Sequence, residues 1–327
     1  MKILVFEYIC GGGFCTEELP DSLAKEGLLM LKALLNDLTI IDAHKISVLL
    51  DGRLINNFDD ALEIIVIEKK DDILKRFKSE LSSVDAVWLI APESGEILFN
   101  LTQIVESANK LLLNSPSKAI TQTADKWQTF KQLSTHNINS VSTAILNNNS
   151  RPFPQGTVIK SRDGVGCEDS FFINSEQGFQ SLLAQLNNLE NYIIQPFIEG
   201  EVLSVSALFN KGNAPLLCIN RQYVEIVDKS FKLLACEVNC EMDNGEFQKL
   251  CTQMATAFPD LWGYVGIDLI RCNQQLQVLE INPRLTSSYA GIKEALGINV
   301  AAVVLQLLNS EPEIMASCNQ PITVKLC

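Results

Sequence analysis

The chain has 327 residues, of which 47% are hydrophobic, with 26 lysines and arginines against 39 aspartates and glutamates. A net charge of −13 argues against a nucleic acid as the main partner, because nucleic-acid-binding proteins present a basic surface. Since no run of 18 apolar residues and no cleavable signal pattern is visible, we expect a cytoplasmic protein without membrane contact. The length predicts two or three domains.

Ten cysteines raise the question of a zinc site or of disulfides, but only two histidines, His44 and His136, accompany them. No two cysteines have the C-x-x-C spacing of a zinc site. Several, such as Cys218 and Cys272, lie in apolar runs where cysteine packs as a small hydrophobe. The pattern therefore predicts reduced thiols.

The first third of the chain alternates short apolar runs with helical patterns. We predict strands at 2–9, 37–43, 62–68 and 85–93 and helices at 20–35 and 72–81. Strands that alternate with helices indicate a parallel sheet with both faces covered. Residues 1–113 are therefore expected to form an α/β domain.

Three glycines, at 11–13, follow the first predicted strand. Glycines after a strand are typical of dinucleotide-binding folds, but the full G-x-G-x-x-G spacing is missing here. No acidic residue clearly ends a second strand about twenty residues further on, as that fingerprint requires. We interpret these glycines as allowing the backbone to approach a substrate or a neighbouring domain.

From residue 114 a polar segment leads into a helix that ends near Leu133 and Ile138. The remaining pattern predicts strands and their loops over 141–146, 157–173, 191–210, 215–227, 230–239, 263–272 and 276–283, and helices at 176–189 and 246–258.

Two carboxylates and an amide are expected to meet on the last predicted hairpin. Counting from its turn, Asp268 and Glu280 fall opposite one another, and Asn282 returns to the same face because strand side chains alternate. Oxygen ligands of this kind suit Mg²⁺. Because the flanking residues are apolar, solvated strand ends explain the pattern poorly.

Lys160 ends a predicted strand and is followed by Gly164 and Gly166. The backbone N–H groups of a glycine loop can approach phosphate oxygens while a lysine neutralises their charge. A hairpin with a glycine turn explains the segment equally well, and the Walker A spacing is absent. Lys126, in the opening turn of a helix, is by itself read as a solvated surface lysine.

Pro196 and Gly200 interrupt the apolar segment around Gln195–Ile198. Backbone groups left unpaired there can read the edge of an adenine while apolar side chains cover its faces. A plain connection between two strands explains the segment nearly as well.

In this order the segments resemble the ATP-grasp superfamily over residues 115–310, and the N-terminal part is similar to the domain that usually precedes it. The resemblance implies α/β and α+β architecture, with a Rossmann-like pre-ATP-grasp domain at 1–113. A helical linker and a small lid subdomain would occupy 114–192, and the ATP-grasp subdomain with the Mg²⁺ site 193–327. The activity implied is that of an ADP-forming, ATP-dependent carbon–nitrogen ligase acting through an acyl phosphate.

The resemblance also implies a role for each residue singled out above. The phosphates and adenine of ATP would be held by Lys126, Lys160, Gly164, Gly166, Gln195, Pro196, Phe197 and Ile198. Mg²⁺, or Mn²⁺ in its place, would be coordinated by Asp268, Glu280 and Asn282.

Two arginines are catalytic candidates. Arg284 follows the metal strand and would contact the acyl phosphate or a substrate carboxylate, with Arg221 as the second candidate; a surface salt bridge is the alternative for both. Many family members carry a ribose-binding glutamate where Val202 stands, so Glu201, one residue early, is taken for that contact. Gly266 stands where many members have an arginine.

Segments at 5–13, 88–98, 114–129 and 281–291 most resemble the tyramine–glutamate ligases of methanofuran biosynthesis, and the ligase of pyrrolysine assembly is similar in outline. This implies glutamate, activated through its γ-carboxylate, and tyramine or a related aromatic amine as substrates. Glu7 and Glu93, each at the end of a predicted strand, would receive an ammonium group, with structural capping as the alternative.

Three other functions stay open or are disfavoured. Another amino-acid ligase of the same superfamily remains open, because substrate pockets lie in loops that the motifs do not cover. A nucleotide-binding protein that lost its reaction is disfavoured by the intact metal and lysine set, and a dehydrogenase by the incomplete glycine fingerprint. The expected partners are a small amino acid and an amine, with a homodimer expected from family likeness.

Overall fold

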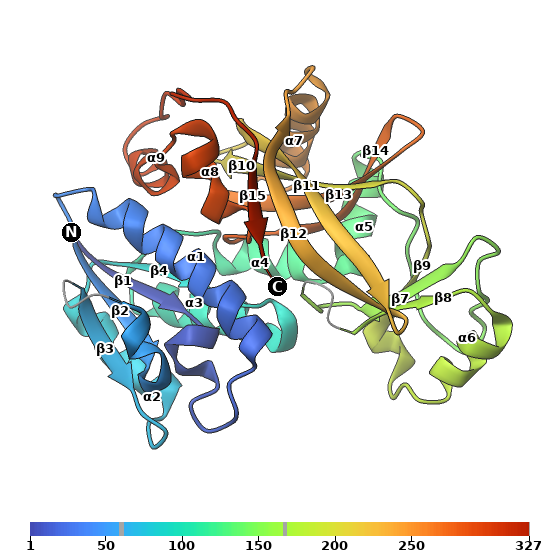
Figure 1. Cartoon of the computed structure of the whole chain (residues 1–327), viewed down its shortest axis with the longest axis horizontal. Coiled ribbons are helices and arrows are strands. Elements are labelled where there is room, and N and C mark those ends of the chain that lie inside the picture. Colours follow the sequence, from blue (N-terminus) through green and yellow to red (C-terminus); the bar gives the residue numbers. More distant parts are fainter. Residues whose placement is uncertain (59–61, 166–168, 327) are drawn as a thin grey trace.

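The structure of the chain, a computed structural model, describes residues 1–58, 62–165 and 169–326 (Figure 1). Its N-terminal part is built on a parallel five-stranded sheet with the order β3-β2-β1-β4-β5. The strands are β1 (Lys2–Glu7), β2 (Lys45–Asp51), β3 (Glu63–Ile67), β4 (Ala86–Ile90) and β5 (Leu111–Leu112). The helices are η1 (Ile9–Gly13), α1 (Asp21–Thr39), η2 (Gly52–Asn57), α2 (Ile73–Glu80), η3 (Leu81–Ser83), η4 (Ser94–Glu96) and α3 (Ile97–Ser107).

One strand of this sheet differs from the sequence-based expectation. The strand predicted at 37–43 is wrong, because α1 continues to Thr39 and β2 begins only at Lys45. Leu34 and Leu38 are fully buried on the inner face of α1, so the apolar period of the helix runs into the segment that resembles a strand. Ile40, just beyond, is 64% exposed, which no central strand of a covered parallel sheet would be.

The glycines at 11–13 form a tight turn rather than an opening for a substrate. A Cβ on Gly11 would lie 2.6 Å from the ring of Phe6, and one on Gly12 would lie 2.5 Å from Cγ2 of Ile67. Gly12 also has a φ of 101°, which only glycine adopts readily. The close approach is therefore to side chains of β1 and β3 in the same domain.

The rest of the chain forms a ten-stranded sheet with the order β14-β13-β10-β11-β12-β8-β7-β9-β6, in which β15 also pairs with β12. Its strands are β6 (Ala144–Ile145), β7 (Thr157–Ser161), β8 (Ser170–Ile173), β9 (Tyr192–Pro196), β10 (Glu201–Phe209), β11 (Leu216–Val227), β12 (Ser230–Glu241), β13 (Gly263–Cys272), β14 (Gln275–Asn282) and β15 (Ile322–Lys325). The helices are α4 (Ser117–Ala124), α5 (Lys126–Thr135), α6 (Glu176–Leu183), η5 (Leu189–Asn191), α7 (Glu246–Ala257), α8 (Tyr289–Leu296) and α9 (Val300–Leu307).

Strands β6 to β9 and helix α6 gather at one end of the molecule, on the right in Figure 1. They share a small core of their own, formed by Leu146, Ile159, Ile173, Phe179 and Ile194. β9 pairs with β7 along its whole length, from Ser161↔Tyr192 to Thr157↔Pro196. The division of the chain at 113/114 and 192/193 stays a prediction.

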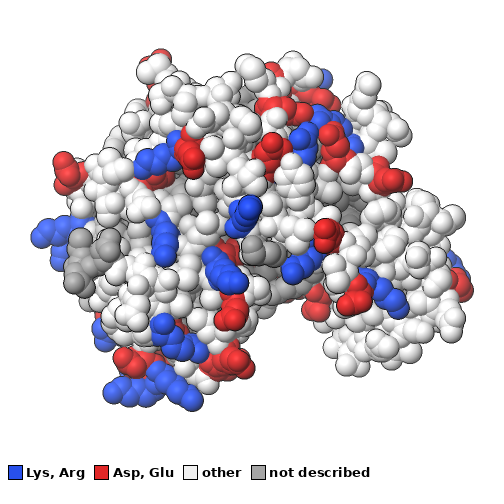
Figure 2. Space-filling view, viewed as in Figure 1, with Lys and Arg blue, Asp and Glu red and all other residues white. Residues whose placement is uncertain are grey.

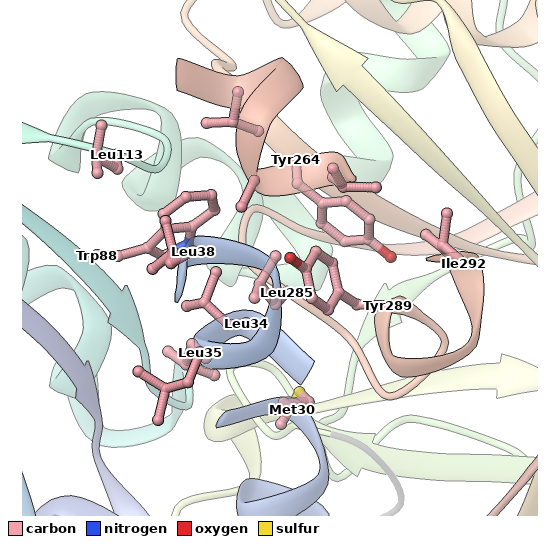
Figure 3. Close-up of a cluster of buried hydrophobic side chains, with 14 of the residues drawn as sticks. Met30, Leu34, Leu35, Leu38, Trp88, Leu113, Tyr264, Leu285, Tyr289 and Ile292 are labelled. Carbon is pink, nitrogen blue, oxygen red and sulfur yellow. The ribbon is translucent and has the colours of Figure 1, made fainter. Parts of the chain in front are cut away.

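Helix α1 packs between the N-terminal sheet and the C-terminal part of the chain. Figure 3 shows the apolar cluster at this junction, with Met30, Leu34, Leu35, Leu38, Trp88, Leu113, Tyr264, Leu285, Tyr289 and Ile292 labelled. Within it, the Tyr289 hydroxyl donates to Oδ2 of the buried Asp37 at 2.8 Å, and Lys293 Nζ lies 2.9 Å from Oδ1. This packing holds the N-terminal domain against α8. The sequence patterns did not predict this contact.

Charged side chains of both signs are interspersed on the face seen in Figure 2, which is hollowed between the N-terminal domain and the β6–β9 end. In the described ranges, no single helix has the length and apolar character needed to cross a membrane. Only α8 and α9 taken together meet those two criteria, across a bend of 102°.

Candidate functional site

Two cavities meet inside the molecule. The first, of about 340 Å³ and here called the lid cavity, lies between β7, the 195–200 segment and the β10–β14 sheet. The second, of about 280 Å³ and here called the N-terminal cavity, lies between the carboxyl ends of β1 and β4, helix α1 and the loop after β14. Gln222, Leu233, Asp268 and Glu280 line both cavities.

The shared wall carries the predicted carboxylate pair. Asp268 on β13 is the register partner of Glu280 on β14, as the turn between the strands predicted. Asn282 Nδ2 donates to Oδ2 of Asp268 at 3.1 Å, and Gln222 Nε2 donates to Oδ1 at 2.9 Å. The three predicted metal ligands therefore converge on one point.

The two carboxylates respond differently to their surroundings. Burial, with the neighbouring charge of Glu280, raises the pKa of Asp268 from 3.8 to about 7. Burial also raises the pKa of Glu280, but Lys126 and Lys160 together lower it below its ordinary value. The lysines thus compensate the charge of Glu280, while ionisation of Asp268 is disfavoured unless a bound cation stabilises its negative charge.

These side chains fit a hard divalent cation. Two carboxylates and an amide offer only oxygen ligands, which is the chemistry of Mg²⁺ sites that complete their coordination with water and phosphate. Within the described residues, no group of three or more His, Cys, Asp and Glu side chains is placed to hold a metal. The donor set is accordingly one that suits Mg²⁺ held jointly with a phosphate-bearing ligand.

Lys126 and Lys160 approach this pair from the lid side. Asp125 caps the N-terminus of α5 by accepting from the N–H groups of Trp127 and Gln128, which places Lys126 at the first helical position. Lys126 Nζ donates to the Gly164 carbonyl and lies 3.4 Å from Oε2 of Glu280. Lys126 is 7% exposed, so its interpretation as a solvated surface lysine is wrong.

Lys160, at the end of β7, has its Nζ 4.0 Å from the same Glu280 oxygen and is 12% exposed. The loop after β7 carries Asp163, whose Oδ2 accepts from the Gly95 N–H at 3.1 Å. Gly166, the second predicted phosphate glycine, lies outside the described residues. The described part of the loop is therefore close to both lysines and to the N-terminal domain.

The predicted adenine segment lines the lid cavity with Gln195, Pro196, Phe197 and Ile198. Its backbone is less free than the sequence suggested, because the Phe197 N–H donates to the Gly156 carbonyl at 2.9 Å. The Gln195 side chain is also engaged, donating to the Thr143 hydroxyl at 2.8 Å. Val202, which stands where many family members carry a ribose-binding glutamate, lines the same cavity.

The structure does not bring Arg221 or Glu201 into either cavity. Gln222 contacts Asp268, so the side chain of Arg221, one residue earlier on β11, points to the other face of the sheet. There Arg221 forms ion pairs with Glu201 at 3.5 Å and Glu237 at 3.2 Å. The catalytic assignment of Arg221 and the ribose assignment of Glu201 are therefore corrected: these residues belong to a surface ion-pair network.

Arg284 lines the N-terminal cavity, where it forms an ion pair with Glu93 across the domain boundary. Its Nε donates to Oε1 and Oε2 of Glu93 at 3.0 and 2.9 Å. The side chains are 12% and 4% exposed, so this is no surface salt bridge. Glu93, expected to receive a substrate ammonium, is instead occupied by Arg284.

Glu7 also lines the N-terminal cavity, at the end of β1. Its carboxylate accepts from the N–H groups of Ile9 at 3.3 Å and Cys10 at 2.6 Å, so it caps the turn that follows. Burial raises the pKa of Glu7 to about 7, although the hydrogen bonds from Cys10 and Ile9 and the charge of Arg284 act in the opposite direction. Glu7 thus combines structural capping with a position facing the cavity.

Two family models together match most of the chain. The model of the ATP-grasp domain matches residues 123–288, and that of the pre ATP-grasp 3 domain matches residues 44–120. The chain belongs to the ATP-grasp family. The predicted fold, with its N-terminal pre-ATP-grasp domain, is confirmed.

Curated relatives are similar over most of their length. The tyramine–L-glutamate ligase of Methanocaldococcus jannaschii is 31% identical over 313 residues, which is 94% of this chain and 90% of the relative. The enzyme of the same name from Methanocaldococcus fervens is 32% identical over 297 residues, 89% of each chain.

Solved structures agree on the ATP-grasp fold. An ATP-grasp superfamily protein from Archaeoglobus fulgidus aligns with a TM-score of 0.74 and 25% identity, covering 99% of this chain and 92% of that one. The L-amino acid ligase of Bacillus licheniformis aligns with a TM-score of 0.66 over 95% and 75% of the two chains, and at 15% identity it supports the fold alone.

Three polar residues of this ATP-grasp site escaped the sequence analysis. Gln222 contacts Asp268, and the Ser287 hydroxyl donates to Oε1 of Glu26 on α1, with both residues of that pair lining the N-terminal cavity. The position of Ser287, three residues after Arg284, was a usable signal. Glu26 gave no signal in the sequence, because an acidic residue on an amphipathic helix is usually a solvated surface residue.

Proposed function

We propose that this ATP-grasp protein is an ADP-forming ligase that joins the carboxylate of L-glutamate to tyramine or a related aromatic amine. The observation that carries the proposal is the Asp268–Glu280 pair, which lies where the two cavities meet and is faced by Lys126 and Lys160. The names of the two methanogen relatives support the substrates.

ATP would occupy the lid cavity. The apolar side chains of Phe197, Ile198 and Val202 line it and would cover an adenine, while the buried Gln195 supports the segment from behind. Lys126 and Lys160 would turn from Glu280 toward the phosphates, since each is a compact charge on a flexible stem.

Asp268, Glu280 and Asn282 would hold Mg²⁺, and Mn²⁺ is proposed as a substitute. When bound, the metal supplies positive charge beside the phosphate oxygens. Gln222 donates to one oxygen of Asp268 and Asn282 to the other, so these two amides orient that carboxylate.

The reaction divides into two steps at the junction of the cavities. The γ-carboxylate of glutamate attacks the γ-phosphorus of ATP, which gives an acyl phosphate and ADP. The neutral amine then attacks the acyl carbon, a carbon–nitrogen bond forms, inorganic phosphate leaves and a proton is released. Arg284, fixed by Glu93, would bind the acyl phosphate.

The test is Mg²⁺-dependent ADP release with glutamate and tyramine, alone and together. We expect release that requires both substrates and disappears in Glu280→Gln. Glu201→Gln, on the opposite face of the sheet, is the matched control and should retain activity. ATP binding without ADP release in the presence of both substrates would overturn the proposal, as would full activity of Glu280→Gln.

No observation favours a catalytically silent nucleotide-binding protein. A homodimer stays part of the proposal from family likeness.

A further inference from the structure

The N-terminal cavity has a mostly apolar wall contributed by the N-terminal domain. Its apolar and aromatic lining residues from that domain are Tyr8, Ile9, Phe14, Leu23, Met30, Ile90, Ala91, Pro92 and Ile97. Such a wall suits an apolar or aromatic body, because burial of apolar surface is favourable and non-directional.

The charges at this wall are unbalanced. Glu7 and Glu26 line the cavity in addition to the carboxylate pair that would hold the metal. Among its described lining residues, Arg284 is the single lysine or arginine, and its guanidinium is already paired with Glu93 at 2.9 Å. Two carboxylates therefore face the cavity, and the cation whose charge acts on them, Arg284, is paired with Glu93.

Gly27 leaves space for the Glu7 carboxylate, at a cost in the stability of helix α1. Gly27 lies inside helix α1, where glycine destabilises a helix by about 1 kcal/mol relative to alanine. A Cβ there would stand 2.6 Å from Oε2 of Glu7, so any larger residue would push the carboxylate away. The N–H groups of Ile9 and Cys10 hold Glu7 from the other side.

The second carboxylate is oriented from the opposite domain. The hydroxyl of Ser287, in the loop after the metal strand, donates to Oε1 of Glu26, 261 residues away in the chain. Glu26 and Glu7 thus come from different elements, α1 and the end of β1, and line the same cavity.

We propose that Glu7 and Glu26 form the subsite for the ammonium group of the acceptor, and that they select an amine without an α-carboxylate over the corresponding amino acid. The inference rests on the proposed ligase function. An amino acid would bring a carboxylate into a cavity whose lining has no unpaired arginine or lysine among its described residues, and there like charges repel.

The experiment compares tyramine with tyrosine as acceptor, at saturating ATP and glutamate. We expect the wild type to prefer tyramine in kcat/KM by about 100-fold or more, the size of one unscreened like-charge contact. Glu26→Gln should raise the KM for tyramine about tenfold, narrow that preference by a similar factor, and leave the KM for ATP and for glutamate unchanged. Glu26→Asp, which keeps the charge, should retain most of the preference.

A purely structural role for Glu26 would lower kcat alike for both acceptors. The inference is overturned if Glu26→Gln leaves both the tyramine KM and the tyramine-to-tyrosine ratio unchanged while the wild type is active. If the wild type releases no ADP with glutamate and either acceptor, the proposed function itself fails, and the subsite falls with it. Glu225→Gln, an exposed carboxylate on β11, is the control.

Discussion

Replacing Glu7 by glutamine is predicted to change how the stability of the protein depends on pH. The Glu7 side chain is 2% exposed, and burial raises its pKa from 4.5 to about 7. Glutamine has nearly the same shape and stays neutral at every pH. The substitution therefore removes the ionisation. It also replaces one of the two oxygens that accept from Ile9 and Cys10, and that loss is the same at every pH.

The sign follows from the direction of the shift. Because the folded-state pKa lies above the unfolded one, the folded protein binds more protons between pH 4.5 and 7, so the free energy of unfolding falls as the pH rises through that window. Integrating the difference in bound protons from pH 5 to pH 8 gives a loss of roughly 2 to 3 kcal/mol.

The assay is chemical denaturation of the ligand-free protein at pH 5 and pH 8. The difference in the free energy of unfolding, Glu7→Gln minus wild type, should be higher at pH 8 than at pH 5 by roughly 2 to 3 kcal/mol. Glu225→Gln removes an exposed carboxylate and is the control. Its difference from the wild type in the free energy of unfolding should be the same at both pH values. A Glu7→Gln difference that does not change with pH would refute the reasoning from burial.

Three further outcomes are expected. Gly27→Ala should raise the tyramine KM about tenfold while the KM for ATP stays unchanged, because the added Cβ lies 2.6 Å from the Glu7 carboxylate; an unchanged tyramine KM would contradict the tight fit. Arg284→Lys should lower kcat about 100-fold in steady-state assays, since lysine cannot reproduce the contacts of Nε and Nη2 with Glu93; near-normal kcat would remove Arg284 from the site. Lys126→Met should reduce ADP formation on the order of 100-fold, and an isothermal titration with an ATP analogue would show whether binding is lost as well.

The convergence of the proposed metal ligands could be predicted from sequence because its geometry is local. A short turn joins β13 to β14, so the register of Asp268 against Glu280 follows from counting, and the alternation of strand side chains adds Asn282. The apolar runs that became β3, β4 and β13 were recognised for the same reason: their own residues carry the pattern.

Other features required information from distant parts of the chain. Strand β11 contains register shifts between Ile219 and Asn220 and between Tyr223 and Val224. A bulge changes which residues face the site, so a strand pattern cannot distinguish Arg221 from its neighbour Gln222. Likewise, residues 37–43 fit a strand by composition, and only the packing of α1 against α8 and α9 shows that the helix continues to Thr39.

The sequence alone was enough to recognise the family, the hairpin that carries the proposed metal ligands and the two lysines, because each depends on short segments whose order along the chain is characteristic. Only the tertiary structure placed Glu7 and Glu26 in one cavity with Arg284, and paired Arg284 with Glu93. Arg284 is distant in sequence from the three glutamates, and their charges interact only when α1 packs against the C-terminal part of the chain.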